Sequence, residues 1–178
     1  MRFLPFVLVL LLSACSPALN WREVPAQPAG LRLMLPCKPD SGARVVPFAG
    51  RDTELSMIGC NAAGMTFALA SARLYDMAQA DAVLAQWREL TLSHTGVREP
   101  RTQAQRPDGA IALANSLRVR TGDQTPGRSP EGAAVHTEAM YFAWGDRVYQ
   151  AVLYAPRRDA VFIDAAETFF GSLRLGRP

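Results

Sequence analysis

The sequence predicts one α+β domain, in which an antiparallel β-sheet packs against a long central helix and a C-terminal helix. Two observations carry this prediction. Short apolar or alternating segments, separated by turn residues, follow one another along the chain as β-strands do. Two amphipathic stretches, residues 76–95 and 159–170, stand among them with the residue spacing of helices. Strands grouped before and after a helix are typical of a layered α+β fold.

Five strands are predicted before the first helix, over residues 21–24, 31–35, 43–48, 53–60 and 65–74. Residues 49–52 form a turn that joins the third and fourth strands into a hairpin. The fifth strand carries apolar residues on both faces. A strand of that kind is covered on both sides, so we expect it in the middle of the sheet.

The first helix is predicted to begin at Asp76, a favourable N-cap, and to stop at Gly96. Its apolar stripe consists of Ala80, Val83, Leu84, Trp87 and Leu90. These positions share one face of a helix, so we expect the stripe to pack on the sheet with Trp87 as its largest anchor.

Further strands are predicted over residues 110–120, 133–144 and 147–154, with one more edge strand in the loop 97–109. Gly145-Asp146 is the strongest hairpin signal in the chain. Residues 121–132 are rich in Gly, Pro and Ser, which predicts an exposed, mobile loop. The last helix is predicted to start at Asp159 and to end at Gly171.

The order of these elements resembles that of the PsbP-like fold, which is named for an extrinsic photosystem subunit and is shared by many bacterial lipoproteins. The resemblance covers residues 20–175. It rests on the order of elements, on the long strand before the Trp87 helix and on the closing Phe169-Phe170-Gly171-Ser172-Leu173. It implies the fold alone, because members of this fold bind different partners.

The first fifteen residues have the layout of a secretory leader. Arg2 supplies the positive charge, and residues 3–12 form an apolar run that is shorter than the roughly 20 residues needed to span a bilayer. The following Leu12-Ser13-Ala14-Cys15 resembles the lipobox of bacterial lipoproteins. The resemblance implies cleavage before Cys15, lipid on its thiol and usually a further acyl chain on the new amine. The alternative is an ordinary signal peptide in which Cys15 is incidental.

On this interpretation residues 1–14 are the signal peptide, residues 15–20 a short lipidated tether, and residues 21–178 a single periplasmic domain. The membrane is then one partner, through the lipid on Cys15, and more than one acyl chain makes the anchoring stable. Ser16 stands where an aspartate retains lipoproteins in the inner membrane, so the resemblance favours the outer membrane over the inner one.

Taking Cys15 for lipid leaves Cys37 and Cys60 as an even pair in an oxidising compartment. We expect them to form a disulfide, which would stabilise the fold by about 3 kcal/mol. A metal pair and two buried free thiols are the competing interpretations. A metal site would need His or further Cys at ligand spacing, and neither residue type stands close to this pair.

Composition and motifs point away from several classes of function. The mature chain is close to neutral and has no basic stripe interleaved with aromatic residues, so nucleic-acid binding is not expected. The sequence carries no serine-nucleophile elbow, phosphate loop or dinucleotide fingerprint, so we expect no enzyme, no cofactor and no metal. His94 suits the end of a helix. His136 and Glu138 share a strand face and are interpreted as a solvent-facing pair, with an acid–base or metal pair as the alternative.

One row of side chains is a candidate interaction patch, because Met140, Phe142 and Trp144 share a strand face. Burial of the row under a helix is the alternative. The leading hypothesis is therefore a membrane-anchored, non-catalytic periplasmic lipoprotein that binds another envelope protein or serves as an accessory subunit. The second hypothesis is a carrier of a small ligand or lipid, with a pocket between sheet and helix.

Overall fold

The computed structural model describes residues 18–26, 30–48, 50–95, 99–121, 127–128 and 132–176. Its strands are β1 (Arg22–Ala26), β2 (Leu31–Leu35), β3 (Asp40–Phe48), β4 (Arg51–Ala62), β5 (Met65–Arg73), β6 (Arg101–Ala104), β7 (Leu117–Arg120), β8 (Gly127–Arg128), β9 (Ala134–Trp144), β10 (Arg147–Ala155) and β11 (Arg174–Leu175). Its helical elements are the 3-10 turn η1 (Met77–Gln79) and the α-helices α1 (Ala80–Thr95) and α2 (Ala160–Gly171). The predicted leader and Cys15 lie outside the described residues, as does most of the predicted loop 121–132.

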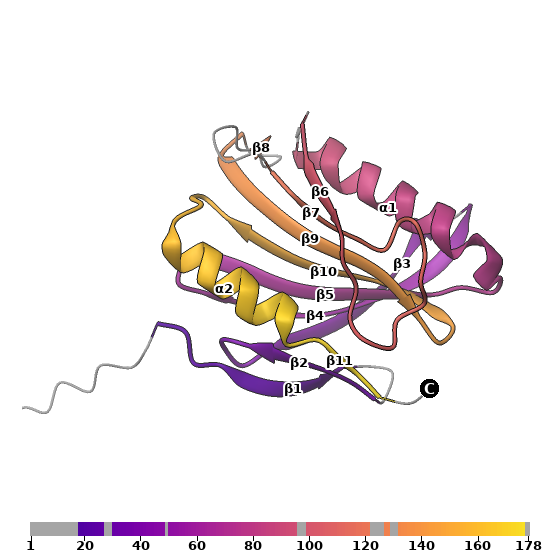
Figure 1. Cartoon of the computed structure of the whole chain (residues 1–178), viewed down its shortest axis with the longest axis horizontal. Helices are drawn as coiled ribbons and strands as arrows, with labels where there is room; N and C mark the ends of the chain where they lie inside the picture. The colour runs from indigo at the N-terminus through magenta and orange to yellow at the C-terminus, as the bar shows by residue number, and fades with distance from the viewer. Residues whose placement is uncertain are drawn as a thin grey trace, which may run out of the picture.

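The strands form two antiparallel sheets. The large sheet has the order β3-β4-β5-β10-β9-β7-β6, with β8 paired to β9, and the small sheet has the order β1-β2-β11. Helix α1 covers one face of the large sheet, whereas α2 and the small sheet lie on the other face (Figure 1). The predicted α+β class with an antiparallel sheet is therefore confirmed. The predicted long central helix is not found. Helix α1 has 16 residues and lies on one face of the large sheet.

Strand β5 lies in the interior of the large sheet, as its two apolar faces predicted. It pairs with β4 on one side and with β10 on the other. Phe67 and Leu69 point to the α2 side, and Ala68 and Ala70 point to the α1 side; all four side chains are buried. Because side chains alternate along a strand, β5 contributes to both cores at once.

The predicted cap at Asp76 forms, but it caps the 3-10 turn η1, and α1 itself begins only at Ala80 and buries a different stripe in its second half. The Asp76 carboxylate accepts a hydrogen bond from the Ala78 backbone N–H at 3.0 Å. The first four members of the predicted stripe are buried, but Leu90 is 43% exposed. Leu90 lies about 80° from Ala80 around the helix axis and Thr91 only about 20°, so the stripe continues through Thr91 instead.

The predicted strand over residues 110–120 is wrong in its first part. Only β7 forms there, and Ile111 meets the sheet through a single isolated bridge to Ala143. The reason is a competing contact: the Asn115 backbone N–H and side-chain amide both donate to the Asp81 carboxylate of α1, at 2.8 and 2.9 Å. This contact ties the segment before β7 to the helix.

The predicted disulfide is confirmed. The Cys37 and Cys60 Sγ atoms are bonded at 2.00 Å, which links the residues after β2 to strand β4 and so joins the two sheets. The hairpin of β9 and β10 around Gly145-Asp146 also forms as predicted. Helix α2 is capped by Asp159, whose carboxylate accepts from the Phe162 N–H at 3.0 Å.

Candidate functional site

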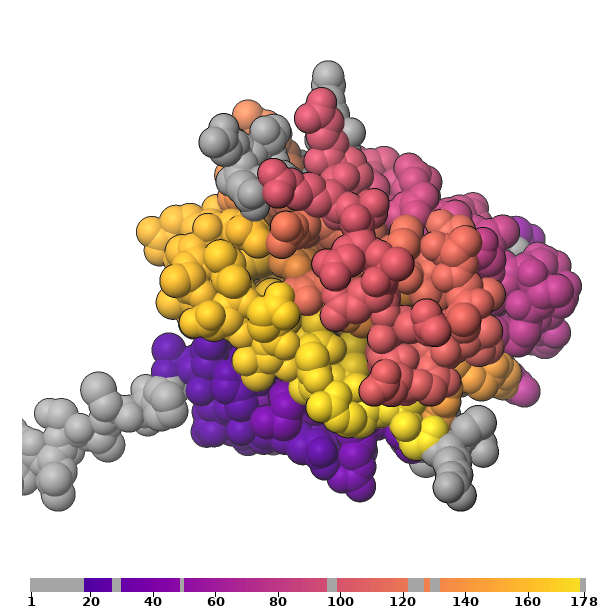
Figure 2. All heavy atoms as spheres, in the orientation of Figure 1, coloured from indigo at the N-terminus to yellow at the C-terminus, as the bar shows by residue number. Residues whose placement is uncertain are grey.

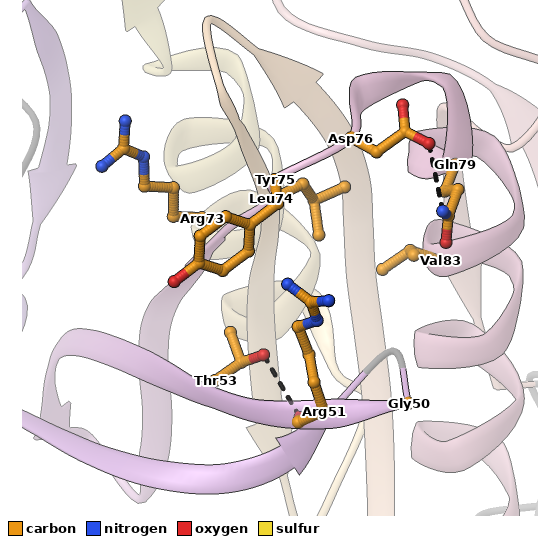
Figure 3. Close-up of a pocket in the computed structure, with 9 residues that line it drawn as sticks. All are labelled: Gly50, Arg51, Thr53, Arg73, Leu74, Tyr75, Asp76, Gln79 and Val83. Atoms are coloured by element: carbon orange, nitrogen blue, oxygen red, sulfur yellow. Dashed lines mark hydrogen bonds between the residues drawn. The ribbon is translucent and has the colours of Figure 1, made fainter.

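The large sheet has two ends, and a recess opens at one of them, which we call the distal end. The register places Arg73 of β5 opposite Arg147 of β10, and the Leu74 N–H donates to the Asp146 carbonyl at 2.9 Å. The recess has a volume of about 180 Å³ (Figure 3). Its lining residues are Gly50, Arg51, Thr53, Arg73, Leu74, Tyr75, Asp76, Gln79 and Val83.

The β3–β4 turn is held over this recess by packing against α1. Phe48 is buried and meets the Trp87 ring edge-on, with 5.0 Å between ring centroids. The buried Thr53 hydroxyl donates to the carbonyls of Phe48 and Arg51, each at 3.3 Å. The end of the β3–β4 hairpin, with Arg51 as the first residue of β4, is therefore fixed by a core contact and by side-chain hydrogen bonds.

Tyr75 is the most distinctive side chain of the distal end. It lies in the link between β5 and η1 and is 83% exposed, more than any other large apolar side chain of the described residues. The Arg51 guanidinium lies 4.7 Å from the centroid of the Tyr75 ring, a cation–π distance, and Figure 3 shows the two side chains together. Tyrosine and arginine are enriched among the residues that dominate protein–protein binding.

The other polar groups of the recess bind one another. Arg73 pairs with Asp146 at 2.6 Å, an exposed ion pair. The Gln79 amide donates to the Asp76 carboxylate at 3.1 Å, so Asp76 serves both Gln79 and the helix start. A volume near 180 Å³ is smaller than the roughly 300 Å³ at which ligand pockets begin. The geometry therefore suits one inserted side chain better than a whole small molecule.

The predicted interaction patch is wrong, because Met140, Phe142 and Trp144 are all buried. They point to the α2 side of the sheet and pack in its core. Trp144 lies so close to Gly30 that a side chain there would meet its ring, since an added Cβ would lie 3.2 Å from Trp144 Cη2. The small sheet thus covers the end of the row.

The predictions for the two histidines fare differently: the predicted exposure is found for His94 but not for His136. His94 is exposed in the last turn of α1, at the end of the helix where the sequence placed it. His136 and Glu138 are both buried, so the solvent-facing interpretation is wrong. The Glu138 carboxylate accepts from Arg118 Nε at 2.6 Å. Arg118 also donates to Glu167 of α2 at 2.8 Å, which shows that the passing helix covers this part of the strand.

A second recess lies between the two sheets and not between sheet and helix. Its volume is about 390 Å³, and it is bounded by Pro25, Ala26, Ser41, Gly42, Ser56, Met57, Ile58, Leu69 and Ser71. Apolar side chains from both sheets and three serine side chains share this lining. The space between the large sheet and α2 is filled by the aromatic core.

Comparison with protein-family models, with curated proteins and with solved structures finds no match to this chain. Within the described ranges, no group of three or more His, Cys, Asp or Glu side chains is arranged to hold a metal ion. No helix of the described part of the chain is long and apolar enough to cross a membrane.

Sequence reasoning missed Arg51 and Tyr75. The available signal was an aromatic residue in a short polar link, Tyr75 between the end of a strand and a helix cap at Asp76. An aromatic residue in such a link has no sheet or helix face to bury it. The partner Arg51 carries no signal of its own, because turns commonly contain arginine.

Proposed function

We propose that this protein is a lipid-anchored lipoprotein of the bacterial envelope, and that its periplasmic domain is a non-catalytic module that binds another envelope protein through the distal end. The observation that carries the proposal is the exposed Tyr75 ring with Arg51 stacked on it. An exposed aromatic side chain held by a cation is already ordered, so binding costs little conformational entropy.

The position of the distal end supports the same proposal. The described chain starts at the opposite end of β5, where the Trp21 ring meets Phe67. Nine residues of β5 span about 30 Å. A domain anchored by Cys15 would therefore hold Tyr75 away from its own membrane and open to a partner.

In-cell photo-crosslinking tests the partner-binding surface. A photoreactive phenylalanine analogue at position 75 should give a discrete protein adduct, and Arg51→Ala should weaken that adduct. Leu90, which is 43% exposed on α1, is the matched control position. No adduct at position 75, or the same adduct at both positions, would contradict the proposal. A catalytic rate of the purified domain that a point mutation abolishes would contradict its non-catalytic part.

The anchoring and the destination are tested separately. Cys15→Ala should leave an unprocessed precursor without lipid, measured by intact mass; normal processing would refute the lipobox. We propose the outer membrane as the destination, on the ground of Ser16. Ser16→Asp should then move the protein to the inner-membrane fraction of a density gradient, while an unchanged distribution would count against this sorting.

We also propose that the domain has the PsbP-like fold, supported by its order of strands and helices. Superposition of an experimental structure on a PsbP-like domain tests this assignment, and a different strand order would reject it.

A carrier of a small ligand is the second candidate function. The observation that favours it is the recess between the two sheets, whose volume of about 390 Å³ falls in the range of ligand pockets. Native mass spectrometry of the purified protein should then show a bound molecule, and Ile58→Trp should displace it. Repeatedly clean spectra of the unsubstituted protein would reject this candidate.

A further inference from the structure

The end of the molecule opposite Tyr75 is where the described chain begins, and we call it the tether end. The Trp21 ring packs edge-on against Phe67, with 5.7 Å between centroids, and the Asn20 N–H donates to the Pro36 carbonyl at 2.9 Å. Phe67 lies two residues into β5, next to the β4–β5 turn. These contacts fix the first described residues to this end of the large sheet.

Helix α2 starts at the same end. Tyr154, near the end of β10, pairs with Thr66 at the start of β5, and α2 begins at Ala160 after a short link. Figure 1 shows the first turn of α2 and the indigo start of the described chain at one end of the molecule. Figure 2 shows part of the α2 surface at that end too. The first described residues and the first turn of α2 therefore lie at the same end of the large sheet.

The beginning of α2 exposes two branched apolar side chains. Val161 is 52% exposed and Ile163 is 40% exposed, although the same helix buries Phe162 between them. Positions two apart lie on opposite flanks of a helix, so no single side of α2 could cover both. Side chains on a helix lean toward its N-terminus, so both lean toward the tether end. A surface that meets the end of the helix would cover both side chains.

The length of chain outside the structure restricts what that surface can be. The predicted lipid-bearing Cys15 lies three residues before Ala18, the first described residue. Three residues reach at most about 11 Å. A bilayer that holds the lipid of Cys15 must therefore lie within that reach of Ala18, on the side where α2 begins.

The charges around the tether end are balanced. Arg22, Lys38, Arg157 and Arg158 are basic, and Glu23, Asp40, Asp159 and Asp164 are acidic. Arg158 is half-buried with its guanidinium over the Phe162 ring, and Asp159 caps α2. Because neither sign of charge is in clear excess, we expect the apolar side chains to dominate the contact with a membrane. Anionic lipid should then contribute little to the binding.

We infer that the first turns of α2 insert Val161 and Ile163 into the headgroup region of the phospholipid bilayer that carries the lipid of Cys15. The inference rests on the lipoprotein proposal. The lipid restrains the domain near the membrane, and the two side chains fix its orientation. The tether end of the domain then faces the bilayer, and the distal end, with Tyr75, faces away from it.

Depth-dependent quenching in vesicles tests the inference. Full-length lipidated protein carrying Val161→Cys or Ile163→Cys is labelled with an environment-sensitive fluorophore, with the disulfide kept intact. The matched control is Leu90→Cys, similarly exposed but on α1. In phosphatidylethanolamine–phosphatidylglycerol vesicles, quencher-labelled lipid should reduce the emission at positions 161 and 163 and leave position 90 unchanged. Phosphatidylcholine vesicles should give the same result.

Each outcome has a defined meaning. Equal quenching at all three positions, or none at 161 and 163 in lipidated, vesicle-bound protein, would overturn the inference and leave the lipoprotein proposal intact. Quenching at 161 and 163 that requires phosphatidylglycerol would overturn the apolar mode of contact. An intact mass without lipid would overturn both proposals. A Val161→Asp/Ile163→Asp variant should keep its lipid and its vesicle binding, and its label at Ala160→Cys should lose the quenching.

Discussion

The two faces of the large sheet are built in different ways. The α1 face is lined by small side chains, chiefly Ala68, Ala70, Ala72, Ala139 and Ala143. Small side chains let a helix approach closely, and a buried polar side chain of the sheet is bonded across the contact. The Gln150 amide donates to Thr91 of α1 at 2.7 Å and to the Tyr141 hydroxyl at 3.0 Å.

The α2 face is filled by aromatic rings instead. Phe67 meets Phe169 of α2 edge-on at 5.5 Å, and Phe142 stacks on Tyr149 at 4.9 Å. Large rings supply buried area and specific ring geometry at once. The comparison teaches that the α2 face depends on filled volume, whereas the α1 face depends on close approach. Substitutions that remove atoms should therefore lower the free energy of unfolding most on the α2 face. Substitutions that add atoms should lower it on the α1 face.

The largest effect is expected from Phe67→Ala. Phe67 is fully buried and contacts both Trp21 and Phe169, so its loss leaves a cavity between the two sheets and α2. We expect the free energy of unfolding to fall by about 3–5 kcal/mol, measured by urea denaturation. Leu90→Ala, on the exposed side of α1, is the control and should change it by less than about 0.5 kcal/mol. A loss below about 1 kcal/mol for Phe67→Ala would contradict the volume argument.

Adding atoms to the α1 face should have the next largest effect. Ala70 is buried beneath α1, so Ala70→Leu would force the helix away from the sheet. We expect a loss of about 1–3 kcal/mol in the same assay. Ala160→Leu, at an exposed position of α2, is the matched addition and should be nearly neutral. If Ala70→Leu were neutral or stabilising, close approach would not be what holds α1.

The third prediction concerns pH, and its effect at neutral pH is nil. Burial raises the pKa of Tyr141 and raises the pKa of Tyr154 to about 12, and both residues belong to the α1 face. The unfolded chain releases these protons near pH 10, before the folded one does. The stability contributed is therefore complete below about pH 10 and is lost as the pH rises toward 12, by at most about 1.4 kcal/mol per pH unit for each tyrosine.

Urea denaturation between pH 9 and pH 12 checks this expectation. Tyr154→Phe should flatten the decline, and Tyr75→Phe, which changes an exposed ring, is its control. A decline that Tyr154→Phe leaves unchanged would show that Tyr154 does not cause it.

Local features of the chain were readable without the structure. Asp76 and Asp159 cap their helices, and Gly145-Asp146 joins its two strands, because caps and tight turns depend on a few neighbouring residues. The pair Cys37 and Cys60 was predictable by count, once the third cysteine was taken for lipid. Each of these features needs little information from distant parts of the chain.

The candidate site could be predicted only in part from the sequence. The strand end and helix start that carry Tyr75 were predicted, and the segment that carries Arg51 was predicted as a turn. That these two segments meet depends on Phe48 packing against Trp87, a contact between elements far apart in the chain.

By itself, the sequence determined both α-helices, most of the strands and which of their side chains share a face. Tertiary structure alone decided what covers each face. Met140, Phe142 and Trp144 share a face as predicted, yet they are core because the small sheet and α2 lie over them. Glu138 is buried for the same reason. Leu90 is exposed because the sheet packs against the neighbouring Thr91 instead. Periodicity is a property of the local backbone, whereas burial is a property of the partner that packs against it.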